Sequence, residues 1–188
     1  FVTESPQYRP RMLYFGVTTG EIDEQTVTFP AAAGASQGDF VVIYNQAGES
    51  EALWLDIDSD GTPPSAAEYL AADVKTAVAV ATGDGADDVA ATAAGAATIA
   101  DVTITDNTDG TVTFTQDEYG VTTAFAHYDE DGSGAGSISV AVDNAGVDPA
   151  IGNGSPDATV EQTGLGTFVV TFAQNYQRAP EVGVTVKT

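Results

Sequence analysis

The sequence predicts an α+β fold that is mainly β: antiparallel strands with one short, Ala-rich helix and β-sandwich-like flanking strands. Three observations lead to this prediction. The chain has 188 residues, of which 43% are hydrophobic, so it contains enough apolar material for a core. Its apolar residues are mostly Val, Ala, Phe and Tyr, with Thr plentiful and Leu scarce, and this mixture favours strands. Apolar and polar residues alternate along several short runs, whereas helical spacing is convincing in one segment alone.

We expect a strand wherever a short apolar or alternating run is bounded by turn-forming residues. The Gly-containing segment 46–50 would join two apolar runs as a hairpin, and Asp109-Gly110 would turn the chain between two runs in which Thr alternates with Val, Ile or Phe. The expected strands are 12–19, 25–29, 39–45, 51–58, 75–81, 102–104, 112–114, 137–142, 168–172 and 182–186.

The expected helix covers about 85–98. Small apolar side chains recur there on one face at helical spacing, which would let the helix lie close to a sheet. Asp84 stands where an N-cap is expected, and Asp87 and Asp88 in the first turn complement the helix dipole.

The same pattern suggests three parts of the chain. An extended arm and strands occupy 1–30, a ββ-β-α-ββ module occupies 38–146, and a strand pair occupies 158–188. We expect the flanking strands, 12–29 and 166–187, to pair with each other or with a neighbouring subunit. In the first case the module is an insertion in a small β-domain.

Charge is distributed unevenly along the chain. Between Met12 and Gln177 there are 26 carboxylates and a single basic side chain, Lys75; the other four bases lie near the two ends, and the formal net charge is −23. Such a field repels phosphates and anionic membranes. We therefore expect no nucleic-acid partner and no membrane association, and no stretch approaches the 18 apolar residues of a transmembrane helix.

Candidate catalytic groups are few. Cysteine is absent, which excludes disulfides, thiol chemistry and Cys-ligated zinc. His127 is the single histidine, and no Gly-x-Ser-x-Gly elbow accompanies it. A carbohydrate-active enzyme would need two unequal carboxylates in a cleft beside aromatics such as Trp54 or Tyr69, and nothing in the sequence marks such a pair. We predict no catalytic residue and a protein that is not an enzyme.

Asp56, Asp58 and Asp60, followed by Gly61, have the spacing that begins an EF-hand-like calcium loop. The twelfth position holds Ala67 in place of the bidentate Glu, and two prolines interrupt the loop. We weigh calcium at these three aspartates against the simpler reading of an acidic strand end running into a turn. The runs 129–132 and 106–110 are weaker versions of the same pattern.

The two ends of the chain combine aromatic and cationic residues, which are enriched at interface cores. We predict that they contact an acidic neighbouring surface, and a solvated end is the alternative. The predicted interface residues are Tyr8, Arg9, Arg11, Tyr176 and Arg178.

A resemblance covers roughly 38–146. The run GDFVVIYNQAGESEALWLDIDSDGTPP, followed by VAVATGDGADDVAATAAGAA, TDGTVTFTQ and DEDGSGAGSISVA, resembles a module that recurs in bacteriophage virion proteins. The closing run GTFVVTFAQNYQRAPEVGVTV is more weakly similar to strand pairs of phage tail-fibre and capsid-associated domains. The resemblance implies a non-enzymatic building or decorating unit without an active site. The helix is poorer in Leu than the phage pattern.

From the charge distribution and this resemblance we expect a phage virion structural protein located on the particle surface. It would be a head decoration protein or a tail or fibre component that assembles with itself and other virion subunits through its terminal arm and strands. The alternative is a secreted or cell-surface adhesin or appendage domain of a halophilic microbe, with calcium at Asp56, Asp58 and Asp60 as a stabilising cofactor.

Overall fold

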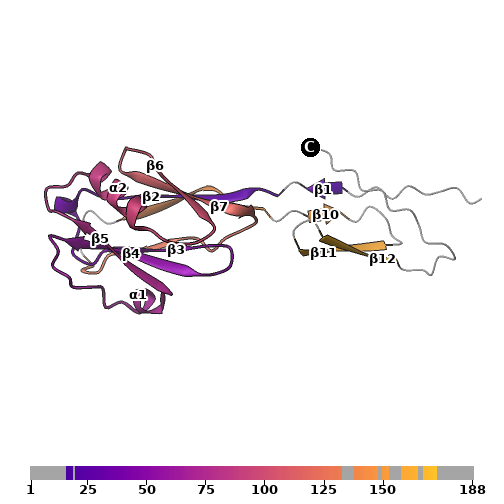
Figure 1. Cartoon of the computed structure of the whole chain (residues 1–188), viewed down its shortest axis with the longest axis horizontal. Coiled ribbons are helices and arrows are strands. Elements are labelled where there is room, and N and C mark those ends of the chain that lie inside the picture. The colour runs from indigo at the N-terminus through magenta and orange to yellow at the C-terminus, as the bar shows by residue number, and fades with distance from the viewer. Residues whose placement is uncertain are drawn as a thin grey trace, which may run out of the picture. The chain divides into compact units, whose positions relative to one another are not determined.

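The computed structural model confirms the mainly β fold (Figure 1). It divides the chain into a larger unit, 20–148, and a smaller unit formed by 1–19 and 149–188. The described residues are 16–18, 20–132, 138–147, 150–152, 158–164 and 167–172, and side chains are described for 20–132 and 138–147.

The larger unit contains two four-stranded sheets, one above the other in Figure 1. The first, here called the β2 sheet, is antiparallel and has the order β6-β7-β2-β9; the second, the β4 sheet, has the order β5-β4-β3-β8 and pairs β4 with β5 in parallel. The strands are β2 (Ile22–Thr28), β3 (Phe40–Tyr44), β4 (Ser50–Ile57), β5 (Val74–Val80), β6 (Val102–Asp106), β7 (Thr111–Tyr119), β8 (Ala126–Tyr128) and β9 (Ser139–Asn144).

The main core lies between the two sheets and against helix α2 (Ala86–Ala96), which contacts β5, β6 and β7. Alternate residues of β2 and β7 point into this core, as period-two strands require. Its largest fully buried side chains come from both sheets and include Phe29, Phe114, Ile43, Leu53 and Leu55.

The β4 sheet has a second buried face. Helix α1 (Ala67–Ala71) covers it, and the Tyr69 ring lies edge-on to Phe40 and to Trp54, at centroid distances of 5.7 and 6.5 Å. With both faces covered, β3 and β4 need apolar residues at consecutive positions, which explains the runs FVVIY and ALWL. The sequence analysis did not predict α1.

Helix α2 lies within the range predicted for it, but its predicted cap is wrong. Gly85 is the N-cap, and its N–H donates to the Asp88 carboxylate at 3.3 Å. Asp84 instead accepts a hydrogen bond from the Ala81 N–H at 2.8 Å and so closes the turn before the helix. A residue that satisfies the preceding turn is not available to cap the helix.

The strand pairings differ from the expected ones. In the smaller unit β1 (Gly16–Thr18) pairs with β10 (Ala150–Gly152), and β11 (Ala158–Gly164) pairs with β12 (Thr167–Phe172). Strand β2, which was grouped with the terminal strands, pairs with β7 and β9 inside the larger unit. Strand β11 was not predicted, and it provides β12 with a partner two residues away, a far shorter loop than any pairing with 12–29. The strand expected at 182–186 lies outside the described residues.

Candidate functional site

The three aspartates of the predicted calcium loop bind different segments, 61–62 of their own loop and Thr82 after β5. Asp56 accepts from the Gly61 N–H at 2.8 Å; Asp58 accepts from the Thr82 N–H at 2.8 Å and from the Thr82 hydroxyl; Asp60 accepts from the Thr62 hydroxyl at 2.8 Å.

This geometry describes a hydrogen-bonded turn at the end of β4. Asp58 and Ser59 adopt positive φ angles of 56° and 59°, and Gly61 one of 72°. The hydroxyl and the N–H of Thr82 lower the pKa of Asp58 below its ordinary value of 3.8, so its carboxylate keeps its charge in mild acid. In the described part of the chain no three Asp, Glu or His side chains are grouped so as to hold a metal ion. Calcium at Asp56, Asp58 and Asp60 stays a prediction.

The predicted interface residues Tyr8, Arg9, Arg11, Tyr176 and Arg178 all lie outside the described residues. Their role as contacts to an acidic neighbour stays a prediction.

The two weaker acidic runs also form hydrogen-bonded turns. Asp106 and Asp109 accept from the N–H groups of Thr108 and Thr111, at 3.0 and 3.1 Å, and close the predicted hairpin between β6 and β7. Glu130 accepts from both the N–H and the hydroxyl of Ser65, at 2.9 Å each. These carboxylates therefore bind loops of the chain itself.

Asp39 is fully buried beneath the 129–132 turn. Its carboxylate accepts from the N–H groups of Ser36 and Glu130, at 3.0 and 3.1 Å. Burial raises the pKa of Asp39 above its ordinary value of 3.8, and the negative charges of Asp129 and Asp131 act in the same direction. A buried carboxylate beside other carboxylates destabilises the fold when it is charged, so Asp39 links stability to pH.

Sequence analysis missed a group of buried polar side chains on β2. Gln25 accepts from the Phe125 N–H at 2.9 Å and donates to Asp23 at 3.0 Å, and both side chains are at most 3% exposed. Asp23 also accepts, at 3.3 Å, from the N–H of Gly146. A Cβ atom at 146 would lie 1.7 Å from the Gly120 carbonyl oxygen, so only glycine fits there. The group ties the 120–125 and 145–147 segments to β2.

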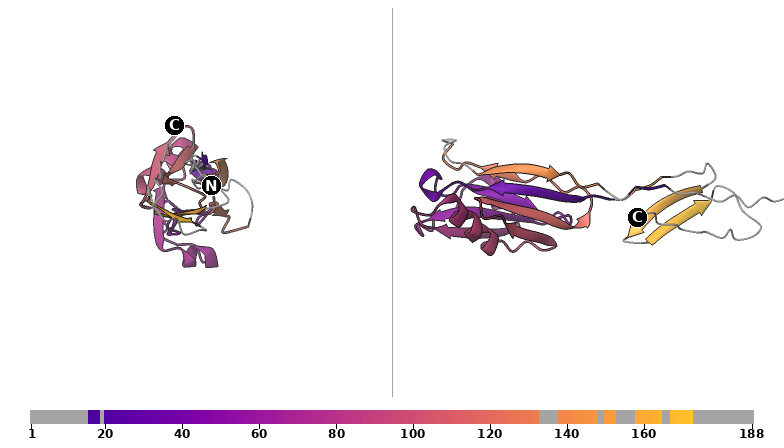
Figure 2. Two further views of the ribbon diagram at one scale, coloured as in Figure 1. Left: turned by 90° about the vertical axis from the view of Figure 1, so that its right-hand side faces the viewer. Right: turned by 90° about the horizontal axis from the view of Figure 1, so that it is seen from above.

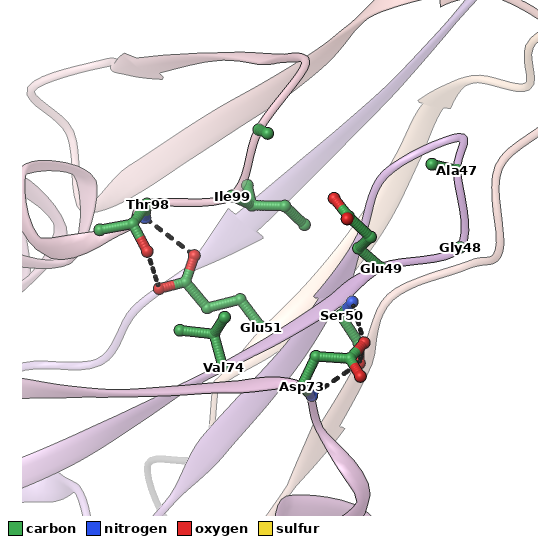
Figure 3. A pocket seen from close by; sticks show the side chains of 10 residues that line it. Ala47, Gly48, Glu49, Ser50, Glu51, Asp73, Val74, Thr98 and Ile99 are labelled. Carbon is green, nitrogen blue, oxygen red and sulfur yellow. Dashed lines mark hydrogen bonds between the residues drawn. The ribbon is translucent and has the colours of Figure 1, made fainter.

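A shallow hollow of about 450 Å³ lies between β4, the start of β5 and the segment after α2 (Figure 3). Glu51 lies at its base and is fully buried, with its carboxylate accepting from the Thr98 N–H at 2.8 Å, the Thr98 hydroxyl at 3.0 Å and the Thr76 hydroxyl. Asp73, at the rim, accepts from the N–H and hydroxyl of Ser50 at 2.9 Å each. The carboxylates of Glu51 and Asp73 in Figure 3 thus bind neighbouring strands or loops, and that of Glu49, also drawn there, accepts from the Asn45 side-chain amide at 2.8 Å.

The residues considered for catalysis do not meet at one place. His127 is exposed on β8. Trp54 and Tyr69, considered as aromatics beside a sugar cleft, are 7% and 6% exposed because they pack between the β4 sheet and α1. They offer no free ring face of the kind a sugar stacks on.

The net charge lies entirely on the larger unit. Outside 20–148 the sequence has four carboxylates, Glu4, Asp157, Glu161 and Glu181, and four of the five bases. The other 24 carboxylates share the range 20–148 with Lys75 as the single base. Among those whose side chains the structure describes, three are buried: Asp23, Asp39 and Glu51. The larger unit is therefore a strongly acidic body, and the smaller unit's sequence is formally neutral.

Comparisons with known proteins found no matching protein family, no matching curated protein and no matching solved structure. No helix in the described residues has the length and hydropathy needed to cross a membrane.

Proposed function

We propose that this chain is a non-enzymatic structural protein of a bacteriophage virion, a surface subunit such as a head decoration protein or a tail or fibre component. It assembles with copies of itself and with other virion subunits through its terminal arm and strands. The observation that carries the proposal is the separation of charge between the two units, taken together with the sequence resemblance over 38–146.

Charge separation favours assembly in one orientation. Two larger units at −23 each repel when they approach closely at low salt, whereas a formally neutral segment with arginines can approach an acidic neighbour without that cost. Copies would thus meet through the smaller units and the segments that carry Arg9, Arg11 and Arg178. The acidic units would then face solvent and keep particles apart.

The hydrogen bonds of the larger unit are consistent with a scaffold role. The acidic turns at 56–62, 106–111 and 129–132 all direct carboxylates to N–H or hydroxyl groups of the same chain. These bonds fix loops between strands, which a subunit that bears load in a particle requires.

Cryo-EM reconstruction of the native particle or filament that contains this chain tests the proposal. We expect density for many copies at symmetry-related surface positions, with terminal segments crossing to neighbours. Isolated chains without subunit contacts in the purified source would contradict it.

Calcium titration distinguishes the alternative, a secreted or cell-surface adhesin or appendage domain stabilised at Asp56, Asp58 and Asp60. Because a ligand that binds only the native state raises its stability, the melting temperature would rise with free calcium and fall with chelator. The Asp58→Asn variant would lose that response. The virion proposal expects equal melting temperatures with calcium and with magnesium at matched ionic strength.

A further inference from the structure

The two sides of the larger unit differ in what covers the edge strands of the sheets. On one side α2 packs against β5 and β6, which are the margins of the two sheets. On the other side the margins are β8 and β9, with three and six residues, and Figure 2 (right) shows β9 in orange along that border. In the described part of the chain β9 pairs with β2 alone. One edge of β9 therefore has no strand partner there.

Strand β9 has some of the features that protect a free edge and lacks others: its register with β2 is irregular between Val142 and Asn144, and it carries the charged Asp143, but it contains no Lys or Pro. Natural edges carry Lys or Pro, or are very short. Strand β9 has neither residue, and five of its six residues are exposed. Val142, on the side that faces the core, is 51% exposed. Its single charged side chain, Asp143, accepts a hydrogen bond from Thr26 on the neighbouring strand. An edge of this kind is competent to accept another strand.

The chain itself contains a segment suited to this edge. In the run 181–187, EVGVTVK, valines alternate with other residues at 182, 184 and 186; the run begins with Glu181 and ends with Lys187, and Arg178 precedes it. Seven extended residues span roughly 23 Å, close to the length of a six-residue strand. The valines supply an apolar face for Val142, and the two bases suit the acidic unit that holds β9.

We propose that segment 181–187 of a second copy adds to the free edge of β9 as a new strand. This inference rests on the proposed function and names the acceptor of the terminal strand in that assembly. The second copy is favoured over an unrelated partner because four of the five bases in this sequence lie outside the acidic unit. Main-chain hydrogen bonds would provide the affinity, and the valines would set the register.

Cysteine cross-linking tests the pairing directly, because the chain has no cysteine of its own. Val142→Cys protein is mixed in turn with separately purified Val182→Cys, Val184→Cys and Val186→Cys proteins and oxidised gently. Residues opposite each other on paired strands lie about 4.5–5.5 Å apart at Cα, within disulfide range. We expect a covalent heterodimer with one of the three, identified by peptide mapping.

Val74→Cys is the matched control. Val74 begins β5, the margin of the other sheet, and is 45% exposed, close to the exposure of Val142. We expect at least a tenfold lower yield of heterodimer with this control. Equal yields from the two positions would overturn the proposal. So would a Val142→Cys/Val184→Cys double variant that cross-links only within one chain, since the occupant would then be the chain's own segment.

Sedimentation of the unmodified chain distinguishes a failure of this inference from a failure of the proposed assembly. If the chain self-associates and no cross-link to position 142 forms, the acceptor edge is wrong and the assembly proposal stands. If the chain remains a monomer across concentration at both low and high salt, the proposed assembly and this inference both fail.

Discussion

The two sheets of the larger unit bury their side chains in different ways. Near β3 and β4 the β4 sheet is covered on both faces, so six of the eight residues of β4 are buried in succession. In the β2 sheet burial alternates, and the outer positions of β7 hold Thr111, Thr113 and Thr115. A substitution in β3 or β4 therefore meets packed atoms at almost every position. The β2 sheet has one face that contributes little to the core.

Trp54→Ala should produce the largest effect, because Trp54 supports α1 on the second face of the β4 sheet. Truncation of a buried aromatic costs about 3–5 kcal/mol in the free energy of unfolding. Denaturant unfolding of the full chain, followed by circular dichroism because Trp54 is the single tryptophan, measures it. A loss below about 1 kcal/mol would mean that this face is not a packed core.

Thr76→Val tests the polar edge of the β4 sheet. The Thr76 hydroxyl donates to the fully buried Glu51 carboxylate, and valine has the same shape without the donor. Hydrogen bonds to charged groups contribute about 1.5–3 kcal/mol, so we expect a loss in that range. Trp54 fluorescence during urea unfolding reports the result. An unchanged midpoint would show that the two bonds from Thr98 suffice for Glu51.

Asp39→Asn tests how the free energy of unfolding depends on pH. Burial of Asp39 sets the sign of that dependence. The folded-state pKa of Asp39 is raised above 3.8, so the folded state holds the proton more tightly than the unfolded state. The contribution of Asp39 to stability therefore falls as pH rises from 3.8 through the folded-state pKa, and it stays lower above that pH. The amide of the Asp39→Asn variant does not titrate, so the variant does not lose stability in this way as pH rises.

We expect the free energy of unfolding of the Asp39→Asn variant to rise relative to that of the parent chain as pH increases from about 4 to about 7. Asp58→Asn, measured below about pH 4, is the control with the opposite sign. The folded-state pKa of Asp58 is lowered, so its stabilising contribution is present above 3.8 and is lost as pH falls through the lower value. A pH-independent difference for Asp39→Asn would contradict the assignment.

Local patterns in the sequence predicted much of the fold and little of its pairing. Strands β3 to β7 and helix α2 were expected close to their observed positions, because alternation, apolar runs and Asp-Gly turns act over a few residues. Helix α1 could not be predicted. It has five residues and no side-chain cap, and it depends on Tyr69 packing against Phe40 and Trp54.

Sequence patterns could not predict the buried polar groups. Asp23 and Gln25 occupy core-facing positions of β2, where the alternation alone would assign apolar residues. Their burial depends on N–H donors from Phe125 and Gly146, which lie about a hundred residues away in sequence. Glu51 likewise depends on Thr98, 47 residues along the chain. These partners lie in connecting segments outside the strands, and only the tertiary fold brings those segments to β2 and β4.

Thr105→Val should have the smallest effect and is the matched partner of Thr76→Val. Thr105 is exposed on the outer face of β6, opposite Thr113 in the strand register. Valine keeps the β-branched shape that strands favour, so we expect a change within about 0.5 kcal/mol in either direction. The same urea titration measures both variants. If Thr105→Val destabilised the chain as much as Thr76→Val, the outer face of the β2 sheet would be a packed surface like the second face of the β4 sheet, and the difference between the two sheets would disappear.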